Sequence, residues 1–177
     1  LLPTVRSRCQ VVVFSPLDDE AMKQWSSSAC GDTRSEDLEF AIDFSCGSPG
    51  IAREAIDSGI PELARSISAF LKLSPASDYT KASESIHSYL SNSVDAQLKE
   101  NPLASKEAAN RRSAYRIFML FGQAARSMVR GDLQEDGIVA AGILVDIERQ
   151  LSTNISIKVL LESLAARWSH LCGGDTA

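Results

Sequence analysis

Long apolar runs, cysteine pairs and glycine or proline repeats are all missing from the 177-residue sequence. No stretch approaches the ~18–20 apolar residues that a membrane-spanning helix needs, so no membrane partner is predicted. Ten glycines and six prolines are too few for a collagen-like or low-complexity chain. The two histidines, His87 and His170, lie alone in their segments, and no C-x-x-C pair accompanies them, which argues against a zinc site.

Catalytic motifs are missing as well. The sequence has no G-x-x-x-x-G-K-[ST] phosphate loop, no H-E-x-x-H pair and no paired-carboxylate motif. No serine or cysteine has a recognisable base partner that would activate it as a nucleophile. From the residues alone, we therefore predict that this chain is not itself an enzyme and that it holds no metal.

The composition is that of a folded chain. Apolar residues make up 44% and charged residues 23%, which separates the sequence from disordered tails. No signal peptide precedes the cysteines, so they are predicted to be reduced and mostly buried thiols of a cytoplasmic protein. The net charge of −5 argues mildly against a protein whose main task is to bind phosphate backbones. The four cysteines are Cys9, Cys30, Cys46 and Cys172.

A β-branched, apolar segment near the N-terminus predicts a single strand. Residues Cys9 to Phe14 read Cys-Gln-Val-Val-Val-Phe, a pattern typical of a strand that is buried on both faces. One strand cannot pair its own peptide groups or cover its faces, and no second strand is predicted downstream. We therefore expect this strand to belong to a sheet whose other strands precede residue 1, which makes the chain the C-terminal part of a longer protein.

Helical periodicity predicts an all-α fold for the rest of the chain. Residues 16–59 are expected to form three short helices. The second helix is predicted to start with a capping box at Thr33 and Glu36, and the third with an N-cap at Ser48 followed by proline. These signals predict a small three-helix domain.

Residues 60–177 are expected to form a bundle of five or six helices. The longest helix is predicted to begin after Ser105 and to be interrupted at Gly131, and Asn154 is the predicted N-cap of the last helix. In each of these predicted helices, apolar residues recur at helical spacing, and we expect them to form a face that is buried in the bundle core. The predicted apolar face of the longest helix comprises Tyr115, Phe118, Met119, Gly122, Ala125, Met128 and Val129.

Charge is unevenly distributed between these two parts. Residues 16–59 carry ten acidic and three basic side chains, whereas residues 104–130 carry six basic side chains and one acidic side chain. Two interpretations of the basic residues stay open: a solvated helix face, or a contact surface for an acidic partner subunit or nucleic acid. The arginines that form this predicted stripe are Arg112, Arg116, Arg126 and Arg130.

Three segments carry a resemblance to a known family. Residues 2–10, Leu-Pro-Thr-Val-Arg-Ser-Arg-Cys-Gln, resemble the Ser-Arg-Cys motif and its lead-in from clamp-loader AAA+ subunits. Residues 47–52 resemble the start of the last lid helix in these subunits, and residues 148–168 resemble the final collar helices. Among clamp-loader subunits, the first motif is most similar to the delta-prime type of bacterial DNA polymerase III.

The resemblance implies a domain organisation and a role. Residues 1–15 would be the remnant of an AAA+ α/β domain, residues 16–59 the lid domain, and residues 60–177 the collar domain that assembles the loader ring. Arg8, with Ser7 and Cys9 as its motif neighbours, would act in trans as an arginine finger on ATP bound to an adjacent subunit. The implied partners are the gamma/tau and delta subunits and, through the whole complex, the sliding clamp and primer-template DNA.

One departure from the family pattern separates two roles within it. Motor subunits carry a sensor arginine where this sequence has Gly50, and Arg53 follows one helical turn later as a possible substitute. The glycine favours a stator that does not hydrolyse ATP, so ATP and Mg²⁺ would lie in neighbouring subunits and this chain would bind no cofactor. The alternatives are a gamma/tau-like ATPase motor subunit and an unrelated all-helical nucleic-acid-binding module.

Overall fold

The computed structural model describes residues 8, 10, 12–31, 33–151 and 155–172. These residues form helices joined by short loops and contain no β-strand, which confirms the predicted all-α class. The described helices, in chain order, are α2 (Asp19–Ala29), α3 (Ser35–Ser45), α4 (Pro49–Asp57), α5 (Ile60–Ser66), α6 (Ser68–Leu71), α7 (Tyr79–Glu100), α8 (Lys106–Arg130), α9 (Gln134–Leu151) and α10 (Ile157–Cys172).

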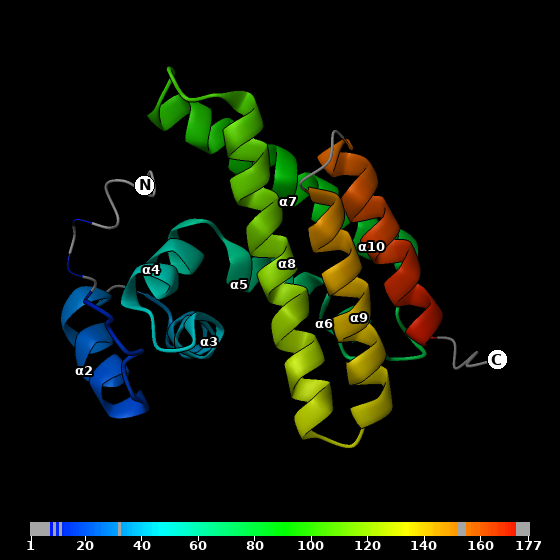
Figure 1. The fold of residues 1–177 in the computed structure, drawn as a ribbon, viewed down its shortest axis with the longest axis horizontal. Coiled ribbons are helices and arrows are strands. Elements are labelled where there is room, and N and C mark those ends of the chain that lie inside the picture. The colour runs from blue at the N-terminus through cyan, green and yellow to red at the C-terminus, as the bar shows by residue number, and fades with distance from the viewer. Residues whose placement is uncertain (1–7, 9, 11, 32, 152–154, 173–177) are drawn as a thin grey trace.

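Helices α2, α3 and α4 gather at one end of the molecule as an N-terminal unit, and α5–α10 form a C-terminal bundle (Figure 1). Helix α8 lies where the two meet, because it contacts α3 as well as α5, α7, α9 and α10. The three short helices predicted for residues 16–59 are therefore present, and the predicted bundle follows them. Within the described residues, no helix combines the length and apolar character needed to cross a bilayer.

Local capping signals were predicted with mixed success. Ser48 caps α4 by accepting a bond from the Ile51 amide, and Ser105 caps α8 in the same way, as predicted. The capping box at Thr33 and Glu36 is wrong, because the N-cap of α3 is Arg34, whose side chain makes no capping bond. Thr33 lies one residue before the N-cap, outside the position whose side chain caps the first-turn amides. The predicted cap at Asn154 lies outside the described residues.

The predicted strand between Cys9 and Phe14 is not formed by its described residues, which are Gln10 and Val12–Phe14. The side chains of Val12, Val13 and Phe14 are 66%, 83% and 89% exposed, and their burial against a sheet that precedes residue 1 stays a prediction. The reason is the one that makes any single strand unstable: no described segment offers a backbone edge with which it can pair. Cys9 and Val11 lie outside the described residues.

The segment that enters α2 is held by a close backbone approach. The Leu17 amide donates a hydrogen bond of 2.8 Å to the carbonyl oxygen of Gly47. Gly47 has φ +82°, and a Cβ added there would overlap the Leu17 carbonyl oxygen and the Pro16 side chain. Glycine is therefore required at residue 47 both for the left-handed backbone and for space.

An aromatic cluster forms the centre of the C-terminal bundle. Trp168 on α10 is fully buried, and its ring packs edge-on against Phe121 of α8 with a centroid distance of 4.7 Å. Phe121 packs edge-on against Phe70 of α6, and the Trp168 indole donates a hydrogen bond of 3.2 Å to the Phe70 carbonyl. The cluster joins three helices with its one indole N–H paired, as buried tryptophan requires.

The apolar face predicted for the longest helix is partly wrong. Tyr115 and Val129 are 58% and 40% exposed, whereas the buried side includes Ile117, Leu120 and Phe121. Helix α8 contacts α3, α5, α7, α9 and α10. Its buried residues therefore cover a wider part of the helix surface than the single apolar face that was predicted. Gly131 follows the end of α8, as predicted.

Candidate functional site

The residues of the Ser-Arg-Cys motif lie at the N-terminal edge of the described chain. Arg8 is exposed and lies in a turn. Ser7 and Cys9 lie outside the described residues. An exposed guanidinium at this point is accessible to a neighbouring molecule.

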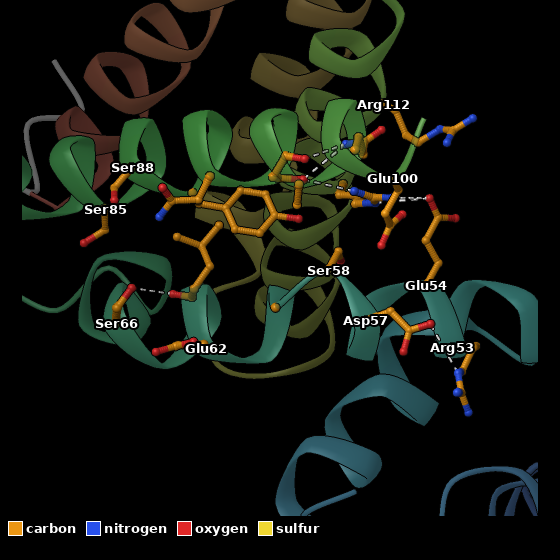
Figure 2. A pocket seen from close by; sticks show the side chains of 18 of the residues that line it. Arg53, Glu54, Asp57, Ser58, Glu62, Ser66, Ser85, Ser88, Glu100 and Arg112 are labelled. Carbon is orange, nitrogen blue, oxygen red and sulfur yellow. Dashed lines mark hydrogen bonds and ion pairs between the residues drawn. The ribbon is translucent and has the colours of Figure 1, made fainter. Parts of the chain in front are cut away.

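Gly50 and Arg53 sit on the first two turns of α4. Gly50 is exposed, with open space where a Cβ would be, so backbone conformation does not demand glycine there. The Arg53 guanidinium donates a hydrogen bond of 2.7 Å to the carbonyl oxygen of Ala29, the last residue of α2, and another of 3.2 Å to Asp57. Figure 2 shows Arg53 and Asp57 facing one another on α4.

These contacts give Arg53 a structural role. The hydrogen bond to the Cys30 thiol and the nearby Asp57 carboxylate raise the pKa of the Arg53 guanidinium above its usual value. A cation at the C-terminal end of α2 pairs with carbonyl groups that have no partner inside that helix. Arg53 therefore fastens α2 to α4.

Arg116 is buried, unlike the solvated stripe in which the sequence placed it. Its Nε donates a hydrogen bond of 3.1 Å to Glu54 of α4, and its Nη1 donates one of 3.2 Å to the Ser93 hydroxyl of α7. The Arg116 side chain is 11% exposed and that of Glu54 is 47% exposed. This ion pair joins the N-terminal unit to the bundle.

The ion pair continues into a polar cluster between α7 and α8. The hydroxyls of Ser93 and Ser113 lie 2.9 Å apart, and both residues are buried. The Gln97 side-chain amide donates a hydrogen bond of 2.9 Å to the Ser113 hydroxyl. Each buried hydroxyl thus has a partner, which is what allows polar groups to lie between two packed helices.

An open cleft of about 1130 Å³ lies beside this cluster, with walls from α4, α5, α7 and α8 (Figure 2). Tyr89 lines the cleft, and its hydroxyl is buried without a hydrogen-bond partner. The charged lining comprises Arg53, Glu54, Asp57, Glu62, Glu84, Glu100, Arg112 and Arg116.

The four arginines of the predicted stripe do not form one external surface. Arg112, Arg126 and Arg130 are exposed, whereas Arg116 is turned inward. The Nη1 of Arg126 lies 2.7 Å from the Cys46 sulfur at the end of α3. Gln123 of the same helix bonds Asp43 of α3. The basic helix is therefore partnered by the acidic unit of its own chain, a possibility that neither sequence interpretation included.

Sequence reasoning missed the groups that hold Arg116. Glu54, Ser93 and Ser113 come from three helices, and no motif connects them. The opposite net charges of residues 16–59 and 104–130 were the one sequence feature that could have indicated this ion pair. They were interpreted as attraction to another molecule, whereas Glu54 and Arg116 pair within the chain.

Among the described residues, no group of three or more histidine, cysteine, aspartate or glutamate side chains could hold a metal ion. The chain matches no protein-family model, and neither a curated protein nor a solved structure is significantly similar to it.

Proposed function

We propose that this chain acts as a delta-prime-like stator subunit of a bacterial DNA polymerase III clamp loader. In this role residues 60–177 assemble with the collar domains of the gamma/tau and delta subunits, and Arg8 reaches ATP bound to an adjacent subunit. The observation that carries the proposal is the Ser-Arg-Cys motif at residues 7–9, with Arg8 exposed. A guanidinium supplied from outside a nucleotide site stabilises charge that develops on the phosphates during transfer.

The exposed segment after the motif supports the same role. Val12, Val13 and Phe14 are mostly exposed among the described residues. A β-branched segment of this kind becomes stable when it pairs with a sheet. The proposal assigns residues 1–15 to the sheet of an AAA+ domain, with residues 16–59 as its lid, which places Arg8 at the domain edge that faces a neighbour.

The stator role is favoured over the motor role by α4. Gly50 cannot contact a nucleotide phosphate through a side chain, and Arg53 is held by Ala29 and Asp57. Moving Arg53 to a nucleotide would release the end of α2. The proposal therefore places ATP and Mg²⁺ in neighbouring subunits.

The nucleic-acid-binding alternative has less support. Arg116 of the basic helix is buried against Glu54, and the exposed Arg126 contacts Cys46 of the chain itself. The other two arginines of the stripe, Arg112 and Arg130, lie about 27 Å apart at 1.5 Å per residue. Two separated cations release few counterions from a nucleic acid, so affinity through this helix would be low. Primer-template DNA would instead be bound by the whole complex.

The test is an Arg8→Ala variant reconstituted with the other loader subunits of the same organism. Complex assembly is expected to be unchanged, and ATP turnover at the adjacent site is expected to fall about 10³-fold or more, the scale of a lost arginine finger. DNA-stimulated ATPase and native mass measurement give the two readouts. Arg34→Ala, which removes another exposed arginine, is the matched control and should leave both unchanged.

Unchanged turnover in the Arg8→Ala complex would remove the arginine-finger assignment. Loss of assembly in that variant would assign Arg8 a structural role instead.

A further inference from the structure

The open cleft of about 1130 Å³ separates α4 and α5 from α7 and α8. Figure 2 shows Glu62 and Ser66 on one wall and Ser85 and Ser88 on the wall opposite. We name it the α5–α7 cleft. Because it is long, open and lined largely by polar side chains, it resembles a binding groove more than a small-molecule pocket.

Helix α7 lines the cleft with polar groups that have no partner in the described part of the chain. Ser85, Ser88 and Asn92 make no side-chain hydrogen bond there. At three and four residues apart, they lie on one side of the helix. Tyr89 lines the cleft as well, and its hydroxyl is buried without a hydrogen-bond partner. A strip of this kind can pair with the peptide groups of a bound chain.

The charges that line the cleft are unbalanced. Two of its three arginines are held in ion pairs, Arg53 with Asp57 and Arg116 with Glu54. Three carboxylates and one guanidinium remain without an ion pair among the described residues. These are Glu62, Glu84, Glu100 and Arg112.

Two of the remaining carboxylates mark the ends of the polar strip. Glu84 and Glu100 of α7 are both exposed and lie about 24 Å apart along the helix axis. The charge of Glu62 also acts on Arg65, which lies outside the cleft. The cleft therefore has an anionic group at each end of α7 and hydroxyl and amide groups between them.

We infer that the α5–α7 cleft binds an extended, cationic segment of a partner protein. About seven extended residues span 24 Å, since each adds ~3.3 Å. Basic side chains of such a segment pair with Glu84 and Glu100, and its peptide groups face Ser85 and Ser88. Small residues on both walls let a backbone approach closely. These include Ser58, Gly59, Ser66, Ser85, Ser88 and Ala96.

Charge and length favour this occupant over others. A nucleic acid or an acidic peptide would meet a carboxylate at each end of α7 and be repelled. A small amine would reach only one of the two ends. Binding in the cleft involves neither Arg8 nor ATP, so this proposal and the proposed function can fail independently.

The test is fluorescence anisotropy of a labelled heptalysine peptide titrated with the full chain at about 0.15 M salt. Exposed ion pairs are weak, so a dissociation constant of about 10–100 µM is expected. The double variant Glu84→Gln/Glu100→Gln should raise it about fivefold or more. Its matched control, Glu135→Gln/Glu148→Gln, removes the same charge from exposed residues of α9 outside the cleft and should change it less than twofold.

A second pair of variants separates binding in the cleft from attraction to surface charge. Ser88→Trp fills the cleft without changing the charge and should weaken heptalysine binding about tenfold or more. Ser91→Trp places the same side chain on an exposed residue of α7 outside the cleft and should change binding less than twofold. Circular dichroism checks that every variant is folded.

A wild-type chain that does not bind heptalysine at about 1 mM would overturn the proposal. Equal losses in the two double variants, or in the two tryptophan variants, would overturn it too, since binding would then depend on surface charge alone. Spermine that binds as tightly as heptalysine would assign the cleft to small polyamines and remove the assignment to a protein segment.

Discussion

Arg112 and Arg116 lie one turn apart on α8 and have different surroundings. Arg112 is exposed at the rim of the open cleft, whereas Arg116 is buried and bonds Glu54 and Ser93. A nearly buried guanidinium requires compensation for its lost hydration, and these two partners supply it. Identical residues four apart in sequence therefore have different consequences for stability.

Replacing Arg116 with alanine should lower the free energy of unfolding by about 1–2 kcal/mol, because Ser93 loses a partner and the packing of the long side chain is lost. Glu54 is half exposed and can be rehydrated, which keeps the loss below that of a fully buried pair. Arg112→Ala is the matched control, with an expected change within about 0.5 kcal/mol. Urea denaturation measures both. Equal losses in the two variants would contradict the assigned roles.

At the scale of elements, α8 and α9 are consecutive helices that approach closely near their shared turn. Gly137 is buried in the first turn of α9, and a Cβ added there would lie 2.7 Å from the amide nitrogen of Val129 and 3.0 Å from the carbonyl oxygen of Ala125. Those atoms belong to the backbone of α8 and cannot move aside without bending that helix. The glycine therefore sets the distance between the two helices.

Gly137→Ala should destabilise the protein by about 1–3 kcal/mol, since overpacking forces the backbones apart. Gly122→Ala, within α8 at a site with open space, should stabilise it by about 0.5–1 kcal/mol because alanine has the higher helix propensity. Thermal unfolding followed by circular dichroism compares the two. A Gly137→Ala protein as stable as Gly122→Ala would show that α8 and α9 can separate without loss.

At the scale of the whole molecule, the N-terminal unit and the bundle are held by contacts of different kinds. The bundle encloses the cluster of Phe70, Phe121 and Trp168. Apolar side chains of the N-terminal unit, among them Met22 and Phe44, are continuous with that core, and half-exposed polar contacts such as that of Glu54 with Arg116 join the two parts as well. Aromatic burial stabilises more than half-exposed polar contacts do, so local stability should differ between the two.

Native-state hydrogen exchange should show this difference. Amides of α10, which buries Leu160, Leu161, Leu164, Ala165 and Trp168, are expected to exchange only by global unfolding. Amides of α2, which buries Met22 and Ser26, are expected to exchange about 10-fold faster or more through local opening. Equal protection in α2 and α10 would show instead that the molecule opens as one cooperative unit.

The sequence by itself determined the all-α class, the helix order and the starts of α4 and α8, because Ser48 and Ser105 bond amides three residues away. It also located the segment with the Ser-Arg-Cys motif, although the role of Arg8 stays a prediction. The strand at residues 9–14 was predicted from composition, and its described residues lack the neighbour that a strand needs.

Only the tertiary structure decided which arginines of α8 face solvent. Helical periodicity shows which side chains share a face, and it contains no information about which distant helix covers that face. Glu54 and Arg116 are 62 residues apart in the chain, and their ion pair depends on the position of α4 against α8. Contacts within one turn are fixed by the local backbone, whereas contacts between helices are fixed by the packing of the whole chain.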